Sequence, residues 1–331
     1  MPHNTQHPIE DPSFKNIRFG KIGSHNIIAV SWPEEEAGIT RSKLIASEIL
    51  QNFRSVRLVL LVTTGSGLPK PGKPSQVRLG DVVVSSSKHT FGGIVQFSIG
   101  LETGQPEAIG SSYKPATRLL TALAALKSHH MLHDNRMAQY VAKIQASDDA
   151  HYTFPGRDAD EMEEFDNHCE TASVIHYDTI ASGDQLVNDI RVRDQIRDKF
   201  RAKCIETESA GAAAESNCLV ICGICDYADG SASATKAQWE VPSPLAGTRR
   251  EVLGIGLNVS SRVRDGGGAG DGKLCQHQHE GIAGLSQQWR SSRTFDDDQA
   301  ISGLVLVDSF LLSPKLCLLL TCEIAALKLY P

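Results

Sequence analysis

The chain has 331 residues, of which 40% are hydrophobic and 22% charged, an ordinary globular composition with enough apolar side chains for a sizeable core. The formal net charge of −6 argues against nucleic acid or an anionic membrane surface as the main partner. The first residues are polar, and no apolar stretch is long enough to span a membrane. We therefore expect a cytoplasmic protein whose eight cysteines stay reduced.

Strand and helix patterns alternate along the chain up to about residue 230. After a disordered lead-in (1–14), apolar or alternating runs predict strands at 17–22, 26–32, 56–63, 80–85, 93–97, 173–181 and 219–226. Helical spacing predicts helices at 40–53, from 115, after Asp134 and at 185–200. This order predicts a three-layer α/β/α fold around a central mixed, mostly parallel sheet. We expect residues 15–240 to form this domain and residues 241–331 to be an irregular tail.

Two short segments each deliver a pair of acids. The apolar run that begins at Leu219 ends in the two acids Asp226 and Asp229. Asp226 lies at the end of the predicted buried strand, where a carboxylate requires partners or a role. Glu206 and Glu208 follow another short strand, and two acids at this spacing near a strand end can reach one cleft. The alternative is that Glu206 and Glu208 are solvated acids at a helix start, where they suit the helix dipole.

Small residues follow the buried strand at 56–63. Thr64, Gly65, Ser66 and Gly67 form a predicted loop with little side-chain bulk, which allows a ligand to approach the backbone. The alternative is a tight turn without a ligand, since no complete glycine-rich dinucleotide spacing is present.

Three further clusters favour a structural explanation. Cys222 and Cys225 look like a metal-binding pair, but residues three apart on a strand point to opposite faces and cannot bind one metal. Cys275, His277 and His279 (residues 275–279) lack a second half-site. The acids at 34–36 are typical of a solvated helix entry. We therefore expect no metal site.

Several of these segments, in this order, resemble the nucleoside phosphorylase and nucleosidase superfamily. The resemblance extends to the methylthioadenosine/S-adenosylhomocysteine nucleosidases and to the phosphorylase-like modules of fungal NOD-like proteins. It covers about residues 17–230 and is carried by VRLVLLVTTGSGLP (56–69), VRLGDVVVS (77–85), FGGIVQF (91–97), HYDTIASGDQLVND (176–189), CIETESAG (204–211) and LVICGICDYAD (219–229).

The resemblance implies cleavage of the N-glycosidic bond of a purine-type nucleoside. By position, Asp226 looks like the general acid for the leaving base, and Glu208 looks like the acceptor for a ribose hydroxyl. The resemblance also implies a substrate-binding set: Glu206, Thr207, Thr64, Gly65, Ser66, Gly67, Gln185, Leu186 and Val187. It implies no cofactor, with phosphate as a co-substrate only for a phosphorylase. The partner is then a small nucleoside, and a homo-oligomer is allowed because family members usually self-associate.

The sequence departs from the family pattern in three ways. The pattern's first strand is missing ahead of Ile17, and Thr207 stands where the family usually has Met. The small-residue segment contains no Arg to hold phosphate, which favours hydrolysis over phosphorolysis. The closing helix expected after Asp229 is interrupted by Pro242 and Pro244.

Three hypotheses follow from these departures. The chain is a nucleosidase or phosphorylase, a non-catalytic nucleoside-binding or signalling module, or an incomplete product impaired by the loss of an N-terminal strand. A lost strand leaves unpaired sheet edges, which promote aggregation.

Overall fold

The computed structural model describes residues 16–22, 25–32, 38–70, 76–87, 91–109, 113–132, 173–230 and 303–307. The expected lead-in (1–14), the helix after Asp134, the acids at 34–36, the residues 275–279 and the boundary at 240 lie outside these ranges.

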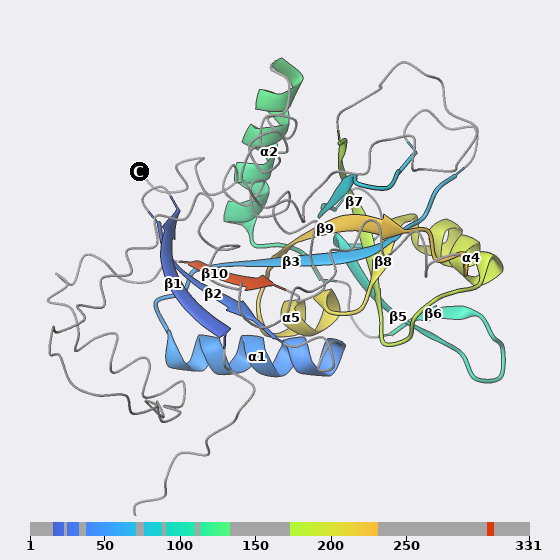
Figure 1. Ribbon diagram of the computed structural model, residues 1–331, viewed down its shortest axis with the longest axis horizontal. Helices are drawn as coiled ribbons and strands as arrows, with labels where there is room; N and C mark the ends of the chain where they lie inside the picture. The colour runs from blue at the N-terminus through green and yellow to red at the C-terminus, as the bar shows by residue number, and fades with distance from the viewer. Residues whose placement is uncertain are drawn as a thin grey trace, which may run out of the picture.

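The structure is a mixed α/β fold built on one ten-stranded sheet (Figure 1). Its strands are β1 (Asn16–Ile22), β2 (His25–Ser31), β3 (Leu58–Gly67), β4 (Val82–Ser85), β5 (Ile94–Ile99), β6 (Pro106–Ala108), β7 (Ile175–Gly183), β8 (Ala202–Glu206), β9 (Leu219–Asp226) and β10 (Gly303–Val307). Its helices are α1 (Ile39–Asn52), α2 (Thr117–Leu132), α4 (Ile190–Phe200) and α5 (Ser209–Glu215).

The sheet follows the order β1-β2-β10-β3-β9-β4-β7-β5-β6, and β8 pairs with both β3 and β7. Strand β3 is parallel to β10 and β9, and β7 is parallel to β4, β5 and β8. The β1–β2, β3–β8, β4–β9 and β5–β6 pairs are antiparallel. The pairing is therefore mixed, because β4 runs against its neighbour β9.

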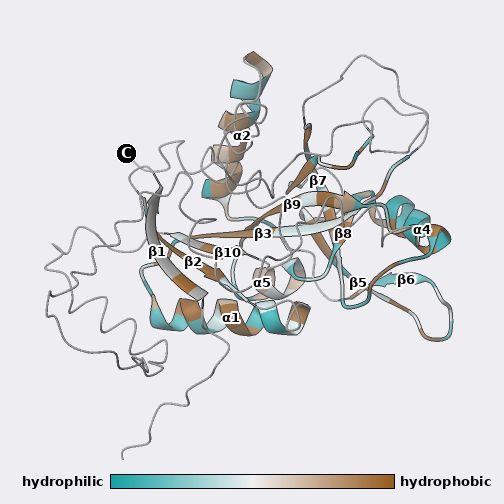
Figure 2. Ribbon diagram, in the orientation of Figure 1, coloured by the Kyte–Doolittle hydropathy of each residue, from teal (hydrophilic) through white to brown (hydrophobic). Residues whose placement is uncertain are grey.

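Helices lie against both faces of the sheet. Helices α1 and α5 lie together on one face, and α2 lies on the other (Figure 1). On the α1 face, Ile45 and Ile49 of α1 are buried in one cluster with Val220 of β9. On the α2 face, Leu119 and Leu123 of α2 are buried in a second cluster with residues of the central strands. Figure 2 shows the central strands mostly in hydrophobic and neutral colours and α4 mostly in hydrophilic ones. Burial of this apolar area is the main force that holds the layers together.

The structure corrects two predicted boundaries. The strand predicted to end at residue 63 continues as β3 to Gly67, because its last residues pair with β8 and β9. The predicted helix at 185–200 begins only at Ile190, where the Asp189 side chain accepts a hydrogen bond from the Arg191 backbone N–H and caps the helix.

The structure also corrects the expectation of an irregular tail for five residues. Residues 303–307 form β10, which lies between β2 and β3 in the interior of the sheet. A five-residue strand carries little local signal of its own, and its two partners lie far away in the sequence. Local periodicity therefore did not reveal it.

Candidate functional site

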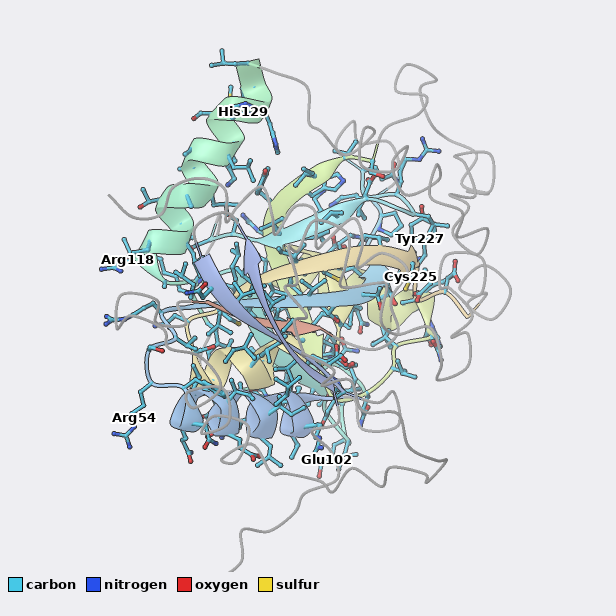
Figure 3. The ribbon with its side chains drawn as sticks, turned by 60° about the vertical axis from the view of Figure 1, so that its left-hand side comes forward. Arg54, Glu102, Arg118, His129, Cys225 and Tyr227 are labelled. Atoms are coloured by element: carbon cyan, nitrogen blue, oxygen red, sulfur yellow. The ribbon has the colours of Figure 1, made fainter. Side chains whose placement is uncertain are left out.

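Three strand ends meet at the candidate site. Ser66 of β3 pairs with Asp226 of β9 and also with Ile205 of β8, so β3 joins the two acid-bearing segments. Figure 3 shows Cys225 and Tyr227 together at the end of β9. The structure thus brings the small-residue segment 64–67 against both Glu206 and Asp226.

Gly65 is required by the crossing of β3 over β8. A Cβ atom at this position would lie 2.2 Å from the Ile205 carbonyl oxygen and 2.9 Å from Cys222 Sγ. These distances are too short for any side chain. The glycine therefore has a packing role in the structure, and the segment is neither the loop nor the tight turn considered from the sequence. Its part in ligand binding stays a prediction.

Glu208 is buried and held by threonines. Its side chain is 2% exposed and accepts hydrogen bonds from Thr63 Oγ1 at 3.0 Å, from the Thr207 backbone N–H at 3.2 Å and from the Thr207 hydroxyl. Its backbone carbonyl accepts a hydrogen bond from Ser42 Oγ of α1 at 2.6 Å. Burial raises the pKa of Glu208, and the threonine hydrogen bonds oppose this rise.

Glu206 caps the start of α5. Its Oε2 accepts the backbone N–H groups of Glu208 and Ser209, each at 2.8 Å, and its Oε1 accepts the Ser209 hydroxyl at 2.5 Å. Burial and the neighbouring Glu208 charge raise the pKa of Glu206 to about 7. Glu206 and Glu208 thus do start a helix, but they are 3% and 2% exposed and are not solvated as the alternative required.

The two glutamates form a coupled acid pair. A hydrogen bond from Glu206 lowers the pKa of Glu208, whereas the Glu208 charge raises that of Glu206. Two buried carboxyl groups close together do not both ionise readily, so the pKa of each lies above its ordinary value.

Asp226 ends β9, a strand whose eight residues are all buried. Asp226 is only 8% exposed, and its Oδ1 accepts a hydrogen bond from the Ala228 backbone N–H at 2.9 Å. Its Oδ2 accepts the weak Cys225 thiol at 3.6 Å. Among the residues that the structure describes, Oδ2 has no stronger donor than this thiol.

The turn after Asp226 is fixed by contacts that the sequence analysis missed. Ala228 has a φ of 52°, in the left-handed region. The Tyr227 hydroxyl accepts the Leu79 backbone N–H at 3.1 Å, and the Tyr227 carbonyl accepts Arg193 Nη1 at 3.2 Å. The available signals in the sequence are a tyrosine directly after a strand-end acid and an arginine within the predicted helix at 185–200. Together these contacts fix the backbone that carries Asp226.

The segment expected to contact the base lies beside this turn. Gln185 and Leu186 are exposed, with Leu186 at 78%, whereas Val187 is buried in a cluster that includes Ala228. Only Val187 of the three therefore packs against the site. The role of all three residues in contacting the base stays a prediction.

The described residues contain no group of three or more His, Cys, Asp or Glu side chains able to hold a metal ion. Cys222 and Cys225 are both buried in β9, as the strand-packing explanation expects. Within the described part of the chain, no helix is both long and apolar enough to cross a membrane.

The chain matches no family model. A nucleotide-binding leucine-rich repeat (NLR)-like protein of Hyaloscypha variabilis is 30% identical over 233 residues, which cover 65% of this chain. The same match covers 23% of that protein, so the chain spans less than a quarter of the length of this relative.

Solved structures similar to this chain are nucleosidases. The 5'-methylthioadenosine/S-adenosylhomocysteine nucleosidase of Neisseria meningitidis, in complex with methylthio-immucillin-A, is 15% identical with a TM-score of 0.40 and covers 69% of this chain and 84% of its own. A futalosine hydrolase mutant of Helicobacter pylori is 19% identical with a TM-score of 0.37 and covers 60% and 67%. At these scores the likenesses carry no argument about activity. The chain is thus similar to both kinds of protein that its motifs resemble, the nucleosidases and the NLR-like proteins.

Proposed function

We propose that this chain hydrolyses the N-glycosidic bond of a purine-type nucleoside. The observation that carries the proposal is the burial and hydrogen bonding of Asp226. This buried carboxyl group ends a fully buried strand, and its Oδ2 meets only a thiol among the described residues. A buried carboxyl oxygen requires a strong hydrogen-bond partner. A base that shares a proton with this oxygen would be such a partner.

In the proposed reaction Asp226 acts as the general acid. The electron pair of the bond between the sugar carbon C1′ and the base goes to the base, and the Asp226 proton goes to the N7 side of the purine. The water oxygen bonds to C1′ and releases a proton, which returns Asp226 to its starting state. General acid catalysis of this kind contributes about 10²–10⁴-fold in rate.

Glu208 is proposed to hold a ribose hydroxyl. Its Oε1 accepts a hydrogen bond from the Thr207 hydroxyl, and a ribose hydroxyl would compete for the same oxygen. The cation-like sugar of the transition state favours nearby negative charge. Glu206 is proposed to fix the backbone that carries Glu208. Its oxygens accept hydrogen bonds from the backbone N–H groups of Glu208 and Ser209 and from the Ser209 hydroxyl.

The test is product analysis. Adenosine, inosine and methylthioadenosine are incubated with the protein, with and without inorganic phosphate, and the base and sugar are measured. We expect free base and the free sugar (ribose, or methylthioribose from methylthioadenosine) at the same rate in both cases. Sugar phosphate formed only when phosphate is present would overturn hydrolysis in favour of phosphorolysis, and no base from any nucleoside would overturn the activity. Sedimentation of the same sample tests self-association.

A second candidate is a non-catalytic nucleoside-binding module. The hydrogen bonds that both glutamates already accept within the protein favour this candidate. Thr63 and Thr207 donate to the Glu208 carboxyl group, and a backbone N–H at the start of α5 donates to Glu206. Calorimetric titration separates the two candidates. Binding of nucleosides without base release supports the module, and turnover excludes it.

A further inference from the structure

Strand β10 lies between β2 and β3 in the sheet. The same five residues pair in parallel with β2 on one side and β3 on the other. Gly303 lies opposite Ile27 and Leu58, and Val307 lies opposite Ser31 and Val62. The strand therefore satisfies backbone groups on two sheet edges at once.

The side chains of β10 enter the cores on both faces of the sheet. Val305 is 2% exposed and packs in the cluster that contains Leu58 and Leu119 of α2. Leu306 is 0% exposed and packs in the cluster that contains Trp32 and Ile45 of α1. Burial on both faces is typical of an interior parallel strand.

Without β10 the sheet has a slot. Strands β2 and β3 are not neighbours in the strand order. Among the residues that the structure describes, the β1–β2 hairpin pairs with the rest of the sheet only through β10. With strands about 5 Å apart, the slot between β2 and β3 is about 10 Å wide, the width of one strand. Buried backbone groups along both edges would then lack partners, which strongly disfavours an empty slot.

We propose that the slot between β2 and β3 is a strand-binding site, that residues 303–307 of the same chain are its occupant, and that this occupant holds the candidate site in place. The site accepts an extended aliphatic segment in parallel register, beginning with a residue without a large side chain. A Cβ atom on Gly303 would lie 3.2 Å from Ile27 Cγ2, so a larger residue fits poorly there.

The slot is linked to the candidate site through β3. Val307 pairs with Val62, and the next residue, Thr63, donates its hydroxyl to Glu208. On the other side Val307 pairs with Ser31, which precedes the buried Trp32. Loss of β10 therefore removes one of the two strands that pair with β3 just before Thr63, leaving β9 as the remaining partner there, and it exposes Trp32. The inference holds whether or not the site is catalytic.

Trp32 provides the readout. The chain has three tryptophans, so the full-length Trp239→Phe, Trp289→Phe protein reports on Trp32 alone. In this background, Val305→Pro removes a backbone donor and a buried side chain from β10. We expect its emission to shift to longer wavelength. A synthetic ISGLVLVDS peptide (residues 301–309) should bind and reverse the shift, whereas a scrambled peptide should do neither.

A second experiment decides the case if Val305→Pro fails to fold. A protease site is placed between residues 231 and 302 of the otherwise unchanged chain, and the two fragments are separated by size after cleavage. Co-elution with unchanged Trp32 emission supports the proposal. The proposal is overturned if the two fragments separate while Trp32 emission and the melting temperature stay unchanged. It is also overturned if folded Val305→Pro shows no shift in emission. A dimer whose cleaved fragments exchange between copies would overturn the assignment of the occupant to the same chain.

Discussion

Replacing Glu206 with glutamine removes the buried acid whose pKa burial and the Glu208 charge raise to about 7. In the unfolded chain the pKa of this group is its ordinary value of 4.5. Below that value both states are protonated, and the folded state has its full stability. As the pH rises towards 7 the folded state retains a proton that the unfolded state releases, so stability falls.

The shift sets the size of the effect. At 1.36 kcal/mol per pKa unit, a rise from 4.5 to about 7 corresponds to about 3 kcal/mol of folding stability lost across this pH range. The three donors to Glu206 remain bonded because a neutral carboxyl group still accepts hydrogen bonds. Glutamine keeps the size of the side chain and one acceptor oxygen, but it does not titrate.

The assay is urea unfolding of the wild-type protein and Glu206→Gln at pH 5, 6, 7 and 8. The other titrating groups are shared, so the difference between the two proteins isolates the glutamate pair. We expect wild type to lose stability relative to the variant as pH rises, by about 3 kcal/mol in total. A remaining slope in the variant is expected from Glu208, whose pKa is also raised. A difference that stays constant with pH, or that grows in favour of wild type, would refute the reasoning.

Three further substitutions test other parts of the structure. Gly65→Ala places a Cβ atom 2.2 Å from the Ile205 carbonyl oxygen, so we expect a loss of about 1–3 kcal/mol in thermal unfolding, and unchanged melting would contradict the crossing of β3 and β8. Leu306→Ala removes a fully buried side chain and should cost about 2–5 kcal/mol in urea unfolding. Its control, Leu186→Ala, alters a side chain that is 78% exposed and should stay within about 0.5 kcal/mol, and equal effects would contradict the burial of β10. Thr207→Val removes the hydroxyl that donates to Glu208 and would compete there with a ribose hydroxyl. Calorimetry should therefore show tighter nucleoside binding, and weaker binding would contradict this competition.

The sequence predicts the elements that have a strong local pattern. The apolar run from Leu219 to Asp226 forms β9 as expected, with the acid at its end. The predicted helix at 40–53 corresponds to α1, whose buried residues include Ile45 and Ile49. These elements are detectable because burial on one or both faces imposes a regular spacing of apolar residues.

The features that the sequence does not predict depend on pairing between distant residues. The end of β3 was expected to be a loop because Gly65 and Gly67 are typical of turns, yet β8 and β9 hold these residues in a strand. Five residues of the tail form β10 because β2 and β3 provide its partners. The raised pKa of Glu206 likewise results from burial by several elements together. Local periodicity contains no information on such contacts.

Base release by two carboxyl variants tests the proposed catalytic role of Asp226 most directly. Asp226→Asn is compared with Asp229→Asn, which changes an acid three residues further along the chain and outside the fully buried strand. Release of free base is followed at saturating nucleoside, with circular dichroism to confirm that both variants are folded. We expect Asp226→Asn to be slower by about 10²–10⁴-fold and Asp229→Asn to stay close to wild type. Undiminished base release by a folded Asp226→Asn protein would contradict the account.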